Sequence, residues 1–335
     1  MPLPLLLIGA AALAGGYGVK KGYDAKKDFD RAKELNNEAQ NVYDGSSRKL
    51  ASARDKAQKA VDQLGRLKFD LYATRLIPFV EAFSKIKNVD FQDRLLRDEL
   101  NLTGLSSEAM LEVRKSALDM QQVVGGGVSA LGAGGLAGLA AYGGVGLLGT
   151  TASGTAIASL SGVAATNATL AWLGGGALSA GGMGMAGGMA VLGGIVAGPV
   201  LAIGGMMLAS KAEEARHNAY SNLSKAEAAA EQMKTAATVT SGIGKRFKEI
   251  GKVLTDLDVL FQPLLKGLQN LVAHSNDYGS YSLADRKGVM MAAALAKTLK
   301  NVMEAPLLDE NGALTAASRQ VLLAGRNKLL EIEGA

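Results

Sequence analysis

The feature that most constrains this chain is a stretch of 91 residues, from Met120 to Ser210, that contains no Asp, Glu, Lys, Arg or His. Charged residues make up 20% of the chain, so a window of this length would ordinarily hold about 18. Glycine occupies 26 of the 91 positions. A helical glycine costs about 1 kcal/mol relative to alanine in water, whereas in lipid a helix satisfies its own backbone. We call residues 120–210 the charge-free segment and predict that it inserts into membranes.

Within the charge-free segment, glycine-rich breaks separate three apolar stretches, at about 123–148, 156–173 and 183–209. The third has a small residue at every fourth position, a glycine-zipper pattern that favours close helix packing in a membrane. This ridge consists of Gly182, Ala186, Ala190, Gly194, Gly198 and Ala202. In the second stretch, Asn167 could hydrogen-bond across helices and Trp172 could lie at a bilayer interface. Alternatively, these two residues form a polar turn and an ordinary buried aromatic.

Basic residues flank the charge-free segment on both sides, with Arg114 and Lys115 before it and Lys211 and Arg216 after it. The positive-inside rule places the basic sequences that flank membrane segments in one compartment. Both flanks are therefore expected on one side of the membrane, with an even number of crossings between them. One of the three apolar stretches is then re-entrant or lies between the other two, which gives an apolar helical hairpin.

The sequences on either side of the charge-free segment carry apolar residues at alternating steps of three and four, which is the heptad pattern of coiled coils. One such seam runs from Phe29 to Leu71 and the other from Leu208 to Leu271. Their bulky members are Leu50, Leu64, Leu67 and Leu71 in the first arm and Ile243, Phe247, Ile250, Leu254, Leu257, Phe261, Leu264 and Leu268 in the second. We expect each seam to find a helical partner, and Pro78 to end or kink the first long helix.

Shorter helices are expected at 79–100, at 106–122 with Ser106 as its N-cap, at 282–303 opened by a capping box from Ser282 to Asp285, and at 315–332. The fold class is thus all-α: an elongated, coiled-coil-like helical bundle with a glycine-rich apolar helical hairpin. The expected divisions are an N-terminal apolar helix (1–19), a helical arm (20–119), the membrane-inserting segment (120–210), a second long arm (211–275) and C-terminal helices (276–335).

Residues that could carry catalysis are sparse, and we expect no enzyme activity, no cofactor and no metal site. The chain has no cysteine, and its two histidines, His217 and His274, have no metal-type spacing to carboxylates. The glycines around Gly132 and Gly134 loosely imitate a dinucleotide fingerprint but follow no predicted strand. Although the sequence pI is about 9.2, acidic and basic residues are interspersed along both arms, which argues against a nucleic-acid partner.

Two runs, Ala164-Ala-Thr-Asn-Ala-Thr-Leu-Ala-Trp-Leu-Gly-Gly-Gly176 and Gly187-Gly-Met-Ala-Val-Leu-Gly-Gly-Ile-Val-Ala-Gly-Pro199, resemble a segment that recurs in uncharacterised bacterial proteins. More broadly, a glycine-rich apolar hairpin between helical arms is similar to apolipoprotein-L-like proteins and helical pore-forming toxins. That resemblance implies a helical bundle that can hide its hairpin and later insert it.

These patterns lead to three functional hypotheses. The first is a membrane-inserting protein that oligomerises and permeabilises or remodels a membrane. The second is a constitutive membrane-anchored coiled-coil scaffold that recruits partners, and the third is a secretion or phage-tail component. The expected partners are a lipid bilayer, further copies of the chain and a possible protein bound through the arms. The expected location is a membrane, or a soluble form that inserts into one.

Overall fold

The computed structural model describes residues 16–93, 104–127, 138–141, 212–309 and 312–333, together with residues 96, 100 and 136. These residues are mostly helical, and no strand occurs among them, so the predicted all-α class is confirmed. In this part of the chain, no helix combines the length and the apolar character needed to cross a membrane.

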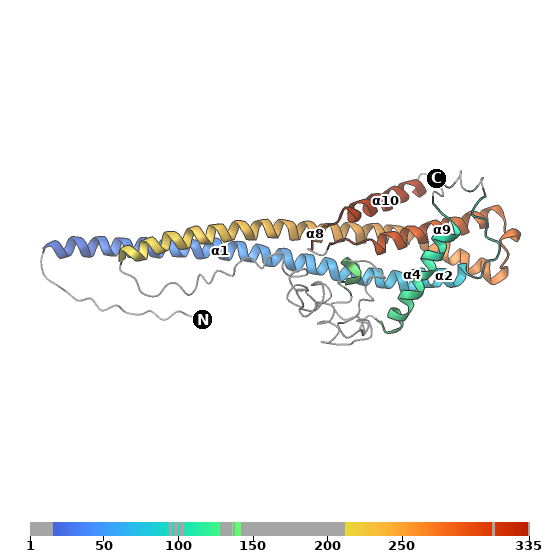
Figure 1. Cartoon of the computed structure of the whole chain (residues 1–335), viewed down its shortest axis with the longest axis horizontal. Helices are drawn as coiled ribbons and strands as arrows, with labels where there is room; N and C mark the ends of the chain where they lie inside the picture. The colour runs from blue at the N-terminus through green and yellow to red at the C-terminus, as the bar shows by residue number, and fades with distance from the viewer. Residues whose placement is uncertain are drawn as a thin grey trace. The chain divides into compact units, whose positions relative to one another are not determined.

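Two long helices, α1 at Gly16–Leu71 and α8 at Ala212–His274, provide most of the described structure (Figure 1). A π-helical turn, η1 at Tyr72–Leu76, and helix α2 at Ile77–Phe83 follow α1. The other elements are α4 (Ser107–Gly125), the 3-10 turn η6 (Tyr278–Ser280), α9 (Leu283–Glu304) and α10 (Ala316–Glu333). Packing divides the chain into unit 1, with Met1–Ala51 and Ala197–Ala237, and unit 2, with Ser52–Val196 and Thr238–Ala335. This division cuts across both predicted arms.

Unit 1 has a small core in which α1 and α8 meet through alanine and leucine side chains. Ala32, Leu35 and Ala219 are buried there. Beside them, the amide nitrogen of Asn222 donates to the side-chain oxygen of Asn36 at 3.2 Å. Each asparagine is a polar interruption of its own seam, and a polar pair inside an apolar seam fixes the register of two helices.

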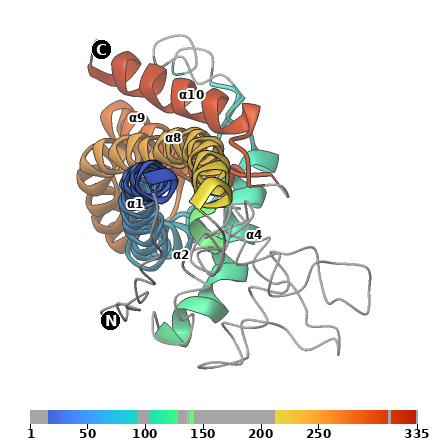
Figure 2. The ribbon, with the colours of Figure 1, turned by 90° about the vertical axis from the view of Figure 1, so that its left-hand side faces the viewer.

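Unit 2 contains the larger core. Within it, α9 and α10 lie beside α8, and α4 crosses η1 and α2 (Figures 1 and 2). The α9 face is rich in alanine, with Ala292, Ala293 and Ala296 fully buried, so neighbouring helices can approach closely. A Cβ atom on Gly244 of α8 would lie 3.1 Å from the Cα atom of Ala57 in α1. The alanine and glycine positions therefore set the helix spacing.

Pro78 does not end the helix, because α2 continues through it, but a π-helical turn replaces the regular α-helix just before it. The N–H of Ile77 donates to the carbonyl of Tyr72, five residues back, which defines the π-helical turn. Pro78 has no N–H for the carbonyl of Thr74, four residues back, and Nη1 of Arg75 donates to that carbonyl at 3.1 Å. Arg75 also binds Asp258 of α8 through Nε at 2.6 Å and Nη2 at 3.3 Å.

Both predicted N-caps are confirmed. The hydroxyl oxygen of Ser106 accepts from the N–H of Ala109 at 3.2 Å at the start of α4. At the start of α9, the hydroxyl oxygen of Ser282 accepts from the N–H of Asp285 at 3.2 Å and its hydroxyl donates to the Asp285 carboxylate at 2.6 Å. These local bonds supply partners for helix N–H groups that lack a preceding turn.

The predicted helix at 79–100 is wrong over residues 84–93, because α2 ends at Phe83. Asn88 has a φ of 59°, which an α-helix cannot accommodate and which asparagine tolerates better than most residues. Lys87 exchanges backbone hydrogen bonds with the turn after α8, donating to Asn276 at 2.7 Å and accepting from Tyr278 at 3.1 Å. This tertiary pairing offsets the local preference for helix.

The close approach of α8 to α1 gives a testable prediction. Gly244→Leu should lower the free energy of unfolding by about 1 to 3 kcal/mol, because the side chain must displace the α1 backbone at Ala57. Gly242→Leu is the matched control, since a Cβ there meets nothing within 4 Å. Urea unfolding followed by circular dichroism measures both, and equal stability of the two variants would contradict this packing.

Candidate functional site

The side chain of Lys68, on α1, is completely buried in unit 2. Its Nζ donates to the backbone carbonyls of Leu139 at 3.0 Å and Ala140 at 2.9 Å. Both acceptors belong to the charge-free segment, and both residues have no exposed surface. A buried amine without partners would be costly, so these two carbonyls are what make the burial of Lys68 possible.

Burial lowers the pKa of Lys68 from 10.5 to about 7, because removal from water disfavours the charged form. The carboxylate of Glu304 acts in the opposite direction and favours the charged form. Lys68 therefore titrates near neutral pH. A neutral amine keeps two N–H donors, so both carbonyl contacts can persist after deprotonation.

Three further polar side chains lie buried or half-buried near Lys68, and we call the four together the polar cluster. The hydroxyl of Tyr72 lies 3.1 Å from that of Ser116 on α4 and 3.3 Å from the Glu304 carboxylate on α9. Ser116 also donates to this carboxylate, and Lys300 pairs with it at 3.2 Å. Burial raises the pKa of the Tyr72 phenol, and the Glu304 charge raises it further.

Backbone contacts hold the same part of the charge-free segment, which we call the apolar turn (residues 136 and 138–141). A Cβ atom on Gly65 of α1 would lie 2.2 Å from the carbonyl oxygen of Leu136, so the two backbones touch. The carbonyl of Ala141 accepts from the N–H of Leu307 at 2.6 Å and that of Leu308 at 3.3 Å. Three successive carbonyls, at residues 139, 140 and 141, therefore receive donors from elsewhere in unit 2.

The chemistry that this arrangement supports is recognition of a peptide backbone. Its donors converge on the carbonyl oxygens of residues 139–141, and a buried backbone carbonyl needs a hydrogen-bond donor. Ser116 is engaged with Glu304, and Glu304 is also paired with Lys300. Among the described residues, no group of three or more His, Cys, Asp or Glu side chains is placed to hold a metal ion.

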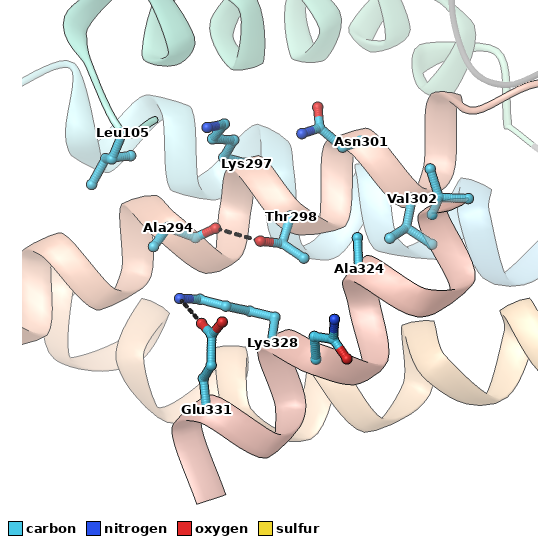
Figure 3. Close-up of a pocket in the computed structure, with 11 residues that line it drawn as sticks. Leu105, Ala294, Lys297, Thr298, Asn301, Val302, Ala324, Lys328 and Glu331 are labelled. Atoms are coloured by element: carbon cyan, nitrogen blue, oxygen red, sulfur yellow. Dashed lines mark hydrogen bonds and ion pairs between the residues drawn. The ribbon is translucent and has the colours of Figure 1, made fainter. Parts of the chain in front are cut away.

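A separate cavity of about 330 Å³ lies between α9 and α10 (Figure 3). Its lysines have partners of their own: Lys297 donates to the carbonyl of Gly104, and Lys328 pairs with Glu331 at 2.9 Å. Its lining also includes the apolar residues Val302 and Ala324. Because both cations are already engaged, the cavity offers weaker recognition of an anionic ligand than its composition suggests.

The residues predicted from the two seams are mostly buried. Leu50 is buried in the unit 1 part of α1, and the others contribute to the unit 2 core or pack against it. The buried members in unit 2 are Leu64, Leu71, Ile243, Phe247, Ile250, Leu254, Leu257, Phe261 and Leu268, while Leu67 and Leu264 are partly buried. The ridge (Gly182, Ala186, Ala190, Gly194, Gly198 and Ala202), Asn167 and Trp172 lie outside the described residues.

Sequence reasoning missed the polar cluster. Gly65, Lys68, Tyr72, Leu76 and Phe79 form a second buried row on the first long helix and η1–α2, displaced by one residue from the predicted seam. The steps of three and four in this row are visible in the sequence. A lysine within an otherwise apolar or small row is the signal that could have identified the site.

The pKa of Lys68 predicts how stability depends on pH. Between about pH 7 and 9 the unfolded chain holds a proton on Lys68 that the folded chain lacks, so the free energy of unfolding should rise with pH by about 1 kcal/mol per unit. Lys68→Met should lose this rise, whereas Lys56→Met, at an exposed position of α1, should keep it. Urea unfolding across this range checks the prediction, and parallel curves for wild type and Lys68→Met would contradict it.

The chain was compared with protein families, curated proteins and solved structures. No protein-family model, curated protein or solved structure matches the chain. The composition of the charge-free segment and the contacts around the apolar turn are therefore the basis for any functional inference.

Proposed function

We propose that this protein inserts its charge-free segment into a membrane, oligomerises there, and permeabilises or remodels the bilayer. The observation that carries the proposal is the absence of any charged residue across 91 positions. A charged residue at the centre of a membrane helix costs about 2.5 to 3.5 kcal/mol on insertion scales, so a bilayer selects against charge. The 26 glycines of the charge-free segment fit the same role, because small residues let membrane helices pack closely.

The proposed architecture is an elongated, coiled-coil-like bundle whose two long arms flank an apolar helical hairpin. It is supported by the buried seams in each unit and by the paired asparagines, Asn36 and Asn222. Helix α4 leads into the charge-free segment, and its exposed basic residues Arg114 and Lys115 suit the headgroup region of a bilayer.

Self-association is assigned to the ridge at positions 182–202. The seam residues of the long helices are covered by other helices of the same chain, as the burial of Phe247 and Leu254 illustrates. They are thus poorly placed to bind a second copy. The ridge, which consists only of glycine and alanine, offers the close backbone contact that membrane oligomers use.

Replacing residues 142–210 by a Gly/Ser linker of equal length should abolish binding to liposomes and release of a trapped dye. The replacement begins after residue 141 because Met120, Val123 and the apolar turn are buried in the core of unit 2. The variant should keep its helical circular dichroism, and a variant lacking residues 1–15 should still bind. Flotation and dye release on the same samples measure these effects.

The possible outcomes separate the rival functions. A linker variant that still floats with liposomes would place the anchor elsewhere, for example in residues 1–19. Wild-type protein that binds liposomes without releasing dye or changing vesicle shape would favour the membrane-anchored scaffold. A wild-type chain that binds no liposomes would contradict both of these functions.

A further inference from the structure

The apolar turn occupies a receptor site built for it in unit 2. Leu139, Ala140 and Ala141 have no exposed surface, and Leu136 is 4% exposed. Most residues in a helical core pack only through side chains. Here the backbone of the turn is contacted as well, at Leu136 by Gly65 and at the three carbonyls of residues 139–141.

Residues on both sides of the apolar turn have the size or the hydrogen-bonding group that its backbone requires. Gly65 is required on one side because any side chain would overlap the carbonyl of Leu136. Lys68 supplies the donors, because its Nζ reaches the carbonyl oxygens of Leu139 and Ala140 in the apolar turn. On the other side, the backbone of Leu307 is held in place by the N–H of Thr315, which donates to the Leu307 carbonyl at 3.0 Å.

We propose that this site, formed by Gly65, Lys68 and the backbone of Leu307 and Leu308, is an intramolecular socket that retains the proximal part of the charge-free segment and restrains its insertion. The inference rests on the proposed membrane function and adds its regulation. The turn lies close to the start of the segment at Met120, so the socket ties that segment to the folded bundle.

The carbonyls in the socket explain how docking and insertion would compete. In a helix that continues beyond residue 141, the carbonyls of residues 139–141 would accept from N–H groups four residues further along. In lipid each of these carbonyls must be satisfied, and the continuing helix supplies the donors itself. A span formed from this stretch therefore needs no donor from the bundle, and it must leave Lys68 behind.

The charged groups near the socket determine which protonation state of Lys68 is favoured once the apolar turn has left. Glu304 of α9 faces it and is paired with Lys300, which also lies 3.3 Å from Glu112 of α4. The apolar turn itself contributes no titratable group. Once the turn leaves, water reaches the amine, and the charge that burial disfavours becomes favourable. This compensates in part for the loss of the two carbonyl contacts.

Gly65→Ala tests the socket directly, because its Cβ must displace the backbone of Leu136. Gly45→Ala, in the same helix and with nothing within 4 Å of its Cβ, is the matched control. In lipid-free buffer, amide hydrogen exchange of a peptide covering 136–141 should become faster on the order of tenfold in Gly65→Ala only. Dye release from phosphatidylcholine–phosphatidylglycerol vesicles should be several-fold faster for that variant than for wild type.

Lys68→Met serves as the second variant, since it leaves the Gly65 contact intact and removes only the donors; it should change exchange and release in the same direction. Unchanged exchange at 136–141 in both variants would show that the socket does not hold the turn. If wild type releases dye and the variants exchange faster but release dye no faster than wild type, the proposal that the socket restrains insertion is overturned. If neither wild type nor any variant binds vesicles while exchange responds as expected, the membrane function fails and the socket remains as a purely structural contact.

Discussion

The contact between Lys68 and the apolar turn joins the charged part of this chain to the part that has no charge. Burying a lysine amine without hydrogen-bond partners is costly, and so is burying a backbone carbonyl without a donor. Each satisfies the other here, with two hydrogen bonds of 3.0 and 2.9 Å. Without these two carbonyls the buried Lys68 amine would have no hydrogen-bond partner among the described residues, so Lys68 and the turn are coupled beyond ordinary side-chain packing.

The π-helical turn that follows α1 arranges the helices around this contact. Extra residues in a helical turn shift the face that side chains present, and such turns are frequent at functional sites. Tyr72 begins the turn and reaches Ser116 and Glu304, while Arg75 within it binds Asp258. One turn thus links α1 to α4, α8 and α9. Pro78, two residues after the end of this turn, accounts for the change from regular α-helix, because it supplies no N–H.

The parts of the fold that could be predicted from sequence are those set by neighbours a few residues away. Heptad spacing identified seam residues such as Leu64 and Phe247 that the structure buries, and the caps at Ser106 and Ser282 are bonds to residues three positions on. The burial of Lys68 depends instead on acceptors 71 and 72 residues away. The end of the helix before Asn88 likewise depends on Asp277, 189 residues further along the chain. Local spacing carries no information about such partners.

The central claim is that the charge-free segment enters a bilayer, and the chain carries its own probe for that. Trp172 is the single tryptophan and lies within the segment. Its fluorescence in the unmodified protein can be followed as vesicles with brominated acyl chains are added. The proposal predicts quenching by the brominated chains and protection from iodide in the water. A tryptophan that remains open to iodide and is unaffected by brominated lipid, in protein that has bound the vesicles, would contradict insertion of this segment.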